Sequence, residues 1–100
     1  MKDLPMPPFL EEAAQLLWFL CRAGLRLDVQ LNPRPILFKL AAHLYVFPNR
    51  KLSHAAAAAA ILDDLLSSPH ITCEARQRAR LIAVIGTYIG NLFRRMNHAA

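Results

Sequence analysis

The segment 74-EARQRARLIAVIGTYIGNLFRRM-96 decides how this chain folds, because it could form a membrane span, a nucleic-acid-binding arm or a packing helix. Three arginines in its first seven residues precede thirteen uncharged, mostly apolar residues (81–93), and two more arginines follow. A helix of that length rises only about 20 Å at ~1.5 Å per residue, whereas a bilayer span needs about 20 residues. The apolar run is therefore too short to cross a membrane.

A helix from residue 73 to residue 96 would be apolar over most of its circumference. Gly86 and Gly90 each cost a helix about 1 kcal/mol relative to alanine, so their presence indicates a close approach by another helix. We therefore predict a helix that is central, or half central and half at an interface, and that packs against the alanine run 55–60. One of its rows follows heptad spacing, and it consists of Ala75, Ala79, Ile82, Gly86, Ile89 and Phe93.

Three more helices are predicted at residues 8–23, 35–47 and 54–67 from their capping residues and helix breakers. Pro8 suits a first helical turn, Gly24 suits a helix end, and Pro48 stops the second helix. Ser53 is a suitable N-cap for the third helix, whose six alanines have the highest helix propensity. The expected fold class is mainly α: a compact bundle of about four helices.

Residues 25–31 (LRLDVQL) alternate between apolar and polar side chains, as half-buried strands do. A strand needs a hydrogen-bonding partner, and the candidates are residues 36–38, residues 44–47 or the same strand of a second copy. An extended linker that lies across the helices is an equally good explanation.

The order of a strand followed by two helices resembles that of ribbon–helix–helix DNA-binding proteins. The resemblance implies that strands from two copies pair, and that polar strand residues such as Arg26 and Gln30 enter the DNA major groove. The first predicted helix and the long last one are additional to that pattern.

The composition limits the possible classes of protein. One hundred residues make one domain (1–100), with residues 1–7 as a proline-rich extended lead-in. Hydrophobic residues make up 55% of the chain, above the usual ~45–50%, which excludes a disordered chain. So much apolar surface favours a protein partner or a homodimer.

The net charge of +5 and nine arginines favour an anionic partner, either nucleic acid or an acidic protein surface. A GC-rich coding sequence, which enriches arginine and alanine together, explains the same composition equally well. No signal peptide or disulfide framework is evident from the two cysteines and the N-terminal residues, so we expect a reducing cytoplasm.

The arginines at the start of the last helix have two explanations. The helix dipole disfavours cations near a helix N-terminus and anions near a C-terminus. The carboxylates of Asp63 and Asp64, near the C-terminus of the preceding helix, are therefore also unfavourably placed. If the two helices form an antiparallel hairpin, these opposite charges can pair within the chain. Alternatively, the cations contact phosphate or an acidic partner, and the candidates are Arg50, Lys51, Arg76, Arg78, Arg80, Arg94 and Arg95.

The sequence contains no convergent catalytic motif. Ser53 and His54 are adjacent, so on a helix they point apart and do not form a nucleophile–base pair. His70 and Cys73 have a zinc-knuckle spacing but lack two nearby ligands. We therefore expect no catalytic residue, no metal, no cofactor and no small-molecule substrate.

These observations favour a small, non-enzymatic protein-interaction module, such as a regulator, an inhibitor or an assembly subunit. It would dock through an apolar helix face rimmed by arginine, with Trp18, Phe19, Tyr88 and Leu92 as apolar anchors. The alternative is a nucleic-acid-binding protein, either a dimeric DNA-binding regulator or a helical subunit that contacts the backbone in a nucleoprotein complex.

Overall fold

The computed structural model describes residues 8–28, 30, 32–49 and 51–99 of the chain, and it confirms the mainly α fold class. Four α-helices are found in this part of the chain: α1 (Leu10–Arg22), α2 (Arg34–Val46), α3 (His54–Leu66) and α4 (Arg78–Ala99). They are joined by two short 3₁₀ turns (Phe47–Asn49 and Ala75–Gln77) and two short strands, β1 (Arg26–Leu27) and β2 (Ile71–Thr72).

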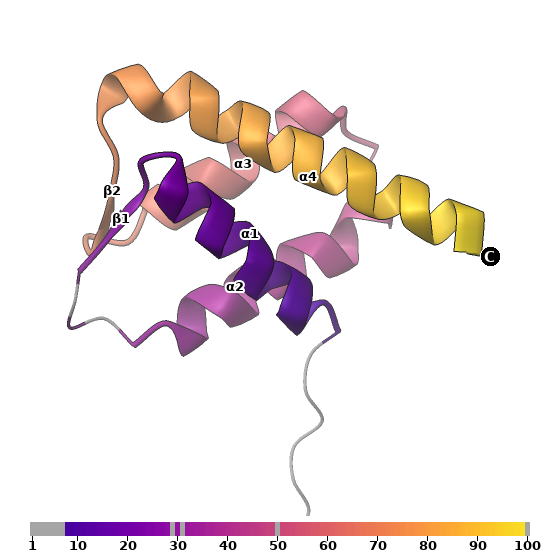
Figure 1. The fold of residues 1–100 in the computed structure, drawn as a ribbon, viewed down its shortest axis with the longest axis horizontal. Helices are drawn as coiled ribbons and strands as arrows, with labels where there is room; N and C mark the ends of the chain where they lie inside the picture. Colours follow the sequence, from indigo (N-terminus) through magenta and orange to yellow (C-terminus); the bar gives the residue numbers. More distant parts are fainter. Residues whose placement is uncertain (1–7, 29, 31, 50, 100) are drawn as a thin grey trace, which may run out of the picture.

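The helices are arranged in two layers. In Figure 1, α1 and α4 lie nearer the viewer, and α2 and α3 lie behind them. The molecule is 21 Å thick, which is about two helix diameters. α1 packs mainly against α2, and α3 mainly against α4. Each helix contributes large, fully buried side chains to the common core, namely Leu16, Leu20, Leu40, Leu44, Leu62, Leu65, Leu81, Ile85 and Ile89.

The first three helices lie close to their predicted positions. α1 begins at Leu10 rather than at Pro8, because its N-cap residue Phe9 adopts a left-handed conformation with φ 68°. α2 ends at Val46, one residue before the predicted end. The predicted N-cap of α3 is confirmed, since the Ser53 hydroxyl accepts a hydrogen bond of 3.1 Å from the backbone N–H of Ala56.

The strand prediction is correct for only part of 25–31. β1 is two residues long and pairs antiparallel with β2, so that Arg26 faces Thr72 and Leu27 faces Ile71. The two partners predicted within the chain were wrong, because β1 pairs with neither 36–38 nor 44–47. This pairing within the chain also differs from the two-copy ribbon of ribbon–helix–helix proteins. Val29 and Leu31 lie outside the described residues.

The last helix begins five residues later than predicted, at Arg78 instead of residue 73. The reason is tertiary in part: pairing with β1 holds residues 71–72 extended with Ile71 buried, and the extended Glu74 and the 3₁₀ turn 75–77 then precede α4. The predicted heptad row is buried only in part, because Ala75 and Ala79 are exposed, Ile82 and Phe93 pack half-buried against the core, and Ile89 is fully buried. The buried face of α4 combines Ile89 of this row with Leu81, Ile85, Tyr88 and Leu92.

The predicted close packing of the last helix on the alanine helix is confirmed. α3 and α4 make the most extensive contact between any two elements described. The approach is tight at Gly90, where an added Cβ atom would lie 3.1 Å from Nδ1 of His54, whereas one on Gly86 would meet the Cβ of Ala58 at an ordinary contact distance of 3.9 Å. α3 and α4 run antiparallel, since Asp63 near the end of α3 pairs with Arg78 at the start of α4.

Candidate functional site

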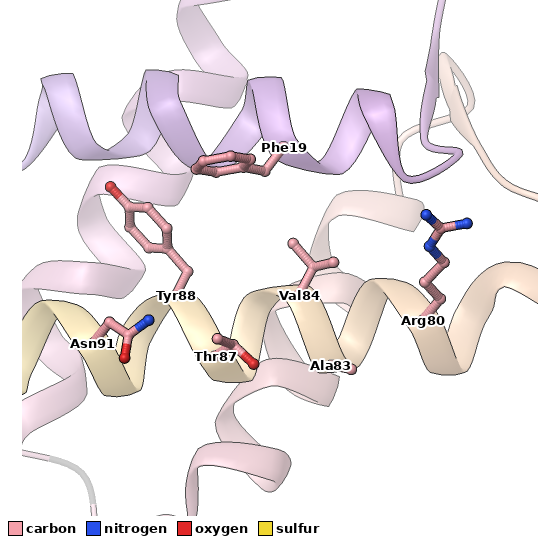
Figure 2. A pocket seen from close by; sticks show the side chains of 7 residues that line it. All are labelled: Phe19, Arg80, Ala83, Val84, Thr87, Tyr88 and Asn91. Carbon is pink, nitrogen blue, oxygen red and sulfur yellow. The ribbon is translucent and has the colours of Figure 1, made fainter.

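A groove of about 390 Å³ lies between α1 and α4 on the front layer of the molecule. Figure 2 shows Tyr88, Val84 and Arg80 rising from α4 towards α1, and the Phe19 ring lying along the side of α1 that faces α4. A smaller hollow of about 250 Å³ continues past Arg80 to Arg22 at the end of α1. The α1–α4 groove is lined by Phe19, Arg80, Ala83, Val84, Thr87, Tyr88 and Asn91.

The spacing of short side chains on α4 creates this groove. Ala83, Thr87 and Asn91 are four residues apart, which places them in one row along the helix. Their side chains are short, so the surface beside Phe19 and Val84 is hollow. Such a row allows the backbone of another segment to approach α4 closely.

Exposed aromatic rings flank the groove on the α1 side. Trp18 is 55% exposed and Phe19 is 39% exposed, and their ring centroids are 5.3 Å apart in an edge-on arrangement. Phe19 also contacts Tyr88, with ring centroids 6.1 Å apart. The two large apolar side chains on α1 are therefore already supported by neighbours while much of their surface faces solvent.

Tyr88 forms the inner wall of the groove and ties α4 to α1. Its ring is mostly buried, and its hydroxyl donates a hydrogen bond of 2.7 Å to Oε1 of Gln15. Burial raises the pKa of the Tyr88 hydroxyl, and the negative charge of Glu12 raises it further, while Arg95 opposes the effect. The hydroxyl is therefore a neutral hydrogen-bonding group at neutral pH.

One end of the groove is cationic. Arg80 lines both the α1–α4 groove and the smaller hollow. Arg22 lines the hollow, and its guanidinium carbon lies 4.7 Å from the centroid of the Trp18 ring, a distance typical of a cation–π interaction. Two guanidinium groups and an exposed indole therefore share this end.

The other two arginines near the start of α4 are paired within the chain. The Arg76 Nε donates to the Glu74 carboxylate at 2.6 Å, and Arg78 pairs with Asp63, which raises the pKa of Arg78. The predicted pairing across the helix hairpin is thus confirmed for Asp63. Arg80 has no ion pair with any residue that the structure describes.

Asp64 does not pair with the arginines, contrary to the hairpin prediction. Nε2 of His43 lies 2.6 Å from its carboxylate, and Nζ of Lys39 lies at 3.4 Å. The His43 hydrogen bond is the main cause of a lowered pKa for Asp64, which burial opposes and the Lys39 charge reinforces. This cluster joins α2 to α3, on the layer behind the groove.

The structure brings only some of the predicted site residues together. Phe19, Tyr88 and Arg80 line the groove, and Trp18 lies against Phe19 without lining it, whereas Leu92 is 4% exposed and belongs to the core. The antiparallel hairpin places His54 beside Gly90, so nearby Lys51 is remote from Arg76 and Arg80. Arg94 and Arg95 are exposed near the end of α4, and Arg50 lies outside the described residues.

Several residues that shape the site were not predicted from the sequence. Arg22, Ala83, Thr87 and Asn91 line the groove and the adjoining hollow, and none of them was among the predicted site residues. The four-residue spacing of Ala83, Thr87 and Asn91 was visible in the sequence. What was not visible is that α1 lies beside this row and leaves it uncovered.

Other kinds of site find no support in the described part of the chain. No group of three or more histidine, cysteine or acidic residues that could hold a metal ion occurs there. Over the same residues, no helix is long and apolar enough to cross a membrane. Cys21 is exposed and Cys73 is half-buried, and both are free; partial burial raises the pKa of the Cys21 thiol.

Comparisons of the chain with protein-family models, with curated proteins and with solved structures each found no match.

Proposed function

We propose that this protein is a small, non-enzymatic interaction module that binds a helical segment of another protein in the α1–α4 groove. A regulator, an inhibitor or an assembly subunit would act in this way. The observation that carries the proposal is the open, largely apolar groove of about 390 Å³ beside the exposed rings of Trp18 and Phe19.

The chemistry of the groove fits protein binding. Aromatic side chains and arginine are enriched at the centres of protein interfaces, where they supply much of the binding energy. Trp18, Phe19 and Arg22 provide this combination at one edge of the groove. Because the rings already contact each other and Arg22, little side-chain freedom is lost when a partner covers them.

The shape of the groove fits a helix in particular. A helix can pack closely on a surface where a row of short side chains leaves room for its ridges. Ala83, Thr87 and Asn91 form such a row on α4, and Phe19 lies across from it on α1, beyond Val84 and Tyr88. The described lining residues include no carboxylate, imidazole or thiol that could act as a catalytic base.

Nucleic-acid binding is supported less well. Arg76 and Arg78 pair with carboxylates of the chain, and Lys51 is remote from them, so the predicted row of phosphate contacts is not assembled. Phosphate binding depends on several cations along one path. We therefore treat nucleic acid as an outcome that the experiment must detect.

Site-specific photo-crosslinking tests the proposal. A photoreactive amino acid in place of Thr87, in the full chain in its native cells, should cross-link one protein through the groove. The same amino acid in place of Ala55, an exposed alanine of α3, is the position control. The Thr87 cross-link should be lost in Ala83→Trp, which fills the groove, and be retained in Ala55→Trp.

Three results would count against this function. These are equal cross-linking from the two positions, a cross-link that survives Ala83→Trp, and a cross-linked product that nuclease removes. The last of these would favour the nucleic-acid alternative.

A further inference from the structure

We propose that the segment bound in the α1–α4 groove is an acidic amphipathic helix, with carboxylates that pair with Arg80 and Arg22. This inference rests on the proposed function and adds the chemistry of the partner. It follows from charge complementarity at one end of the groove.

Arg80 is placed where a cation needs a nearby anion. It is the third residue of α4, near the helix N-terminus, where the helix dipole makes a positive charge unfavourable. Arg76 and Arg78 lie in the same region, and each pairs with a carboxylate, from Glu74 and Asp63. Arg80 has no such partner within the described residues, although it lines the groove.

Arg22 brings a second guanidinium to the same end. It and Arg80 line one hollow together with Phe19, Ala23 and Val84. A guanidinium presents a planar set of donors that fits a carboxylate with two hydrogen bonds. The Trp18 ring beneath Arg22 restricts where its guanidinium can lie, which favours directional binding.

The cation and the apolar surface of the groove are spaced along α4 by about one helical turn, which suits a partner that is itself a helix. Arg80 lies three and four residues before Ala83 and Val84, about one helical turn along α4. A partner helix packed along α4 would therefore need a carboxylate about one turn from its apolar contact. Asp or Glu three or four residues from a leucine or a similar side chain meets this requirement.

The charges argue against two other occupants. A second copy would bring another chain of net charge +5 to a cationic rim, which is unfavourable at long range. Nucleic acid would need cations along the whole path, whereas Arg80 is the only charged residue among the described lining residues of the α1–α4 groove.

Selection from a displayed library of helical peptides tests this inference. The library would carry random residues on one face of an alanine-rich helix, so that acidic, neutral and basic faces compete equally. Clones selected on the wild-type protein would be assayed on Ala83→Trp to identify those that use the groove. We expect these groove-dependent clones to carry Asp or Glu three or four residues from an apolar side chain.

Affinity measurements on the selected peptides then test the arginines. Arg80→Gln and Arg22→Gln should each weaken binding by about three- to fivefold, as expected for a partly exposed ion pair. The matched control is Arg34→Gln on α2, because Arg34 also lies over an aromatic ring, that of Phe38. This control should leave the affinity unchanged.

The outcomes distinguish this inference from the function on which it rests. If the groove-dependent clones are neutral or basic, or if their binding is insensitive to Arg80→Gln, the acidic character of the partner is overturned. The proposed function of the groove as a helix-binding site would still stand. The absence of groove-dependent clones overturns both. If the protein binds a 20-base-pair DNA duplex and Ala83→Trp abolishes this binding, the groove is assigned to nucleic acid. If the protein is a dimer and Ala83→Trp dissociates it, the groove is assigned to a second copy.

Discussion

Gly24 shows how a single residue can join distant parts of this chain. It follows α1 with φ 121°, a conformation that residues with a side chain rarely adopt. Its missing side chain leaves the space that the Gln77 amide occupies, from the 3₁₀ turn before α4. The turn after the first helix and the start of the last helix therefore depend on each other.

Gly24→Ala should destabilise the protein by about 1–3 kcal/mol, because the new Cβ would be strained and would overlap the Gln77 amide. Urea unfolding followed by circular dichroism measures the change. Gly86→Ala is the matched control, since its Cβ would lie at an ordinary distance of 3.9 Å from Ala58. The control should be neutral or stabilise by up to about 1 kcal/mol, through higher helix propensity. Equal losses in the two variants would contradict this account of Gly24.

Asp64 should make stability depend on pH in the acidic range. Its pKa is lowered in the folded state, mainly by the hydrogen bond from His43. The stability from a lowered pKa is present above the unfolded value of about 3.9 and is lost as the pH falls through the folded value. Asp64→Asn should therefore be less stable than wild type at pH 6, by less than about 1 kcal/mol because the group is partly exposed. The deficit should shrink below pH ~4.

The measurement is a series of urea unfolding curves between pH 2.5 and 6, where these limits bracket the ordinary carboxyl range. A double-mutant cycle with His43→Gln provides the control, because the pH-dependent part should largely disappear once the hydrogen bond is absent. A deficit that stays constant down to pH ~2.5 would show that Asp64 contributes in another way.

At the level of the elements, the pair of α3 and α4 depends on small side chains. Ala57 and Ala58 of α3 are buried, and Gly86 faces Ala58 across the contact. Two helices approach closely where neither presents a large side chain. One face of the alanine run therefore packs against α4. The other face, where Ala55 and Ala56 lie, is exposed to solvent.

Ala58→Leu should destabilise the protein by about 1–3 kcal/mol, because three additional carbon atoms would not fit between the helices. Ala55→Leu adds the same atoms at an exposed position and should change stability by less than about 0.5 kcal/mol. Thermal unfolding of both variants tests the difference. Similar melting temperatures for the two would mean that the helices separate at little cost.

The sequence predicted the helices better than it predicted what connects them. Capping and breaking residues such as Ser53 and Pro48 act locally, so they placed the ends of α2 and α3 within one residue. The start of α4 depends instead on pairing between residues 26–27 and 71–72, which are remote in sequence. No local pattern at Thr72 distinguishes a strand from a helix cap.

The candidate site was predictable only in part, for the same reason. The apolar composition favoured a docking surface with Trp18 and Phe19 as anchors, and in the structure both rings are exposed, with Phe19 lining the groove and Trp18 against it. The burial of Leu92 and the separate pairing of Arg76 and Arg78 depend on the packing of α1 and α3 against α4. Which arginine remains available could therefore not be derived from spacing alone.

On the scale of the whole molecule, β1 and β2 connect the two helical pairs. β1 follows α1 and β2 follows α3, so their pairing links α1 and α2 to α3 and α4. Ile71 of β2 is 3% exposed and belongs to the common core. The two pairs should consequently unfold together as one cooperative unit.

Ile71→Ala should destabilise the whole protein by about 2–4 kcal/mol, through lost burial and a remaining cavity. Thr72→Ala, at the exposed neighbouring position, is the control and should change stability by less than about 0.5 kcal/mol. Urea unfolding should show a single transition by circular dichroism and by NMR signals from each helical pair. Separate transitions for the two pairs would contradict the cooperative unit.

The exposure of Trp18 has a practical consequence. It is the only tryptophan of the chain, and more than half of its surface meets water in the folded state. Its fluorescence spectrum should therefore change little when the chain unfolds. Intrinsic tryptophan fluorescence, which is commonly used to follow denaturation, would report poorly on the unfolding of this protein. The same indole would shift to shorter wavelengths when another molecule covers it, which makes it an intrinsic optical sensor of occupancy.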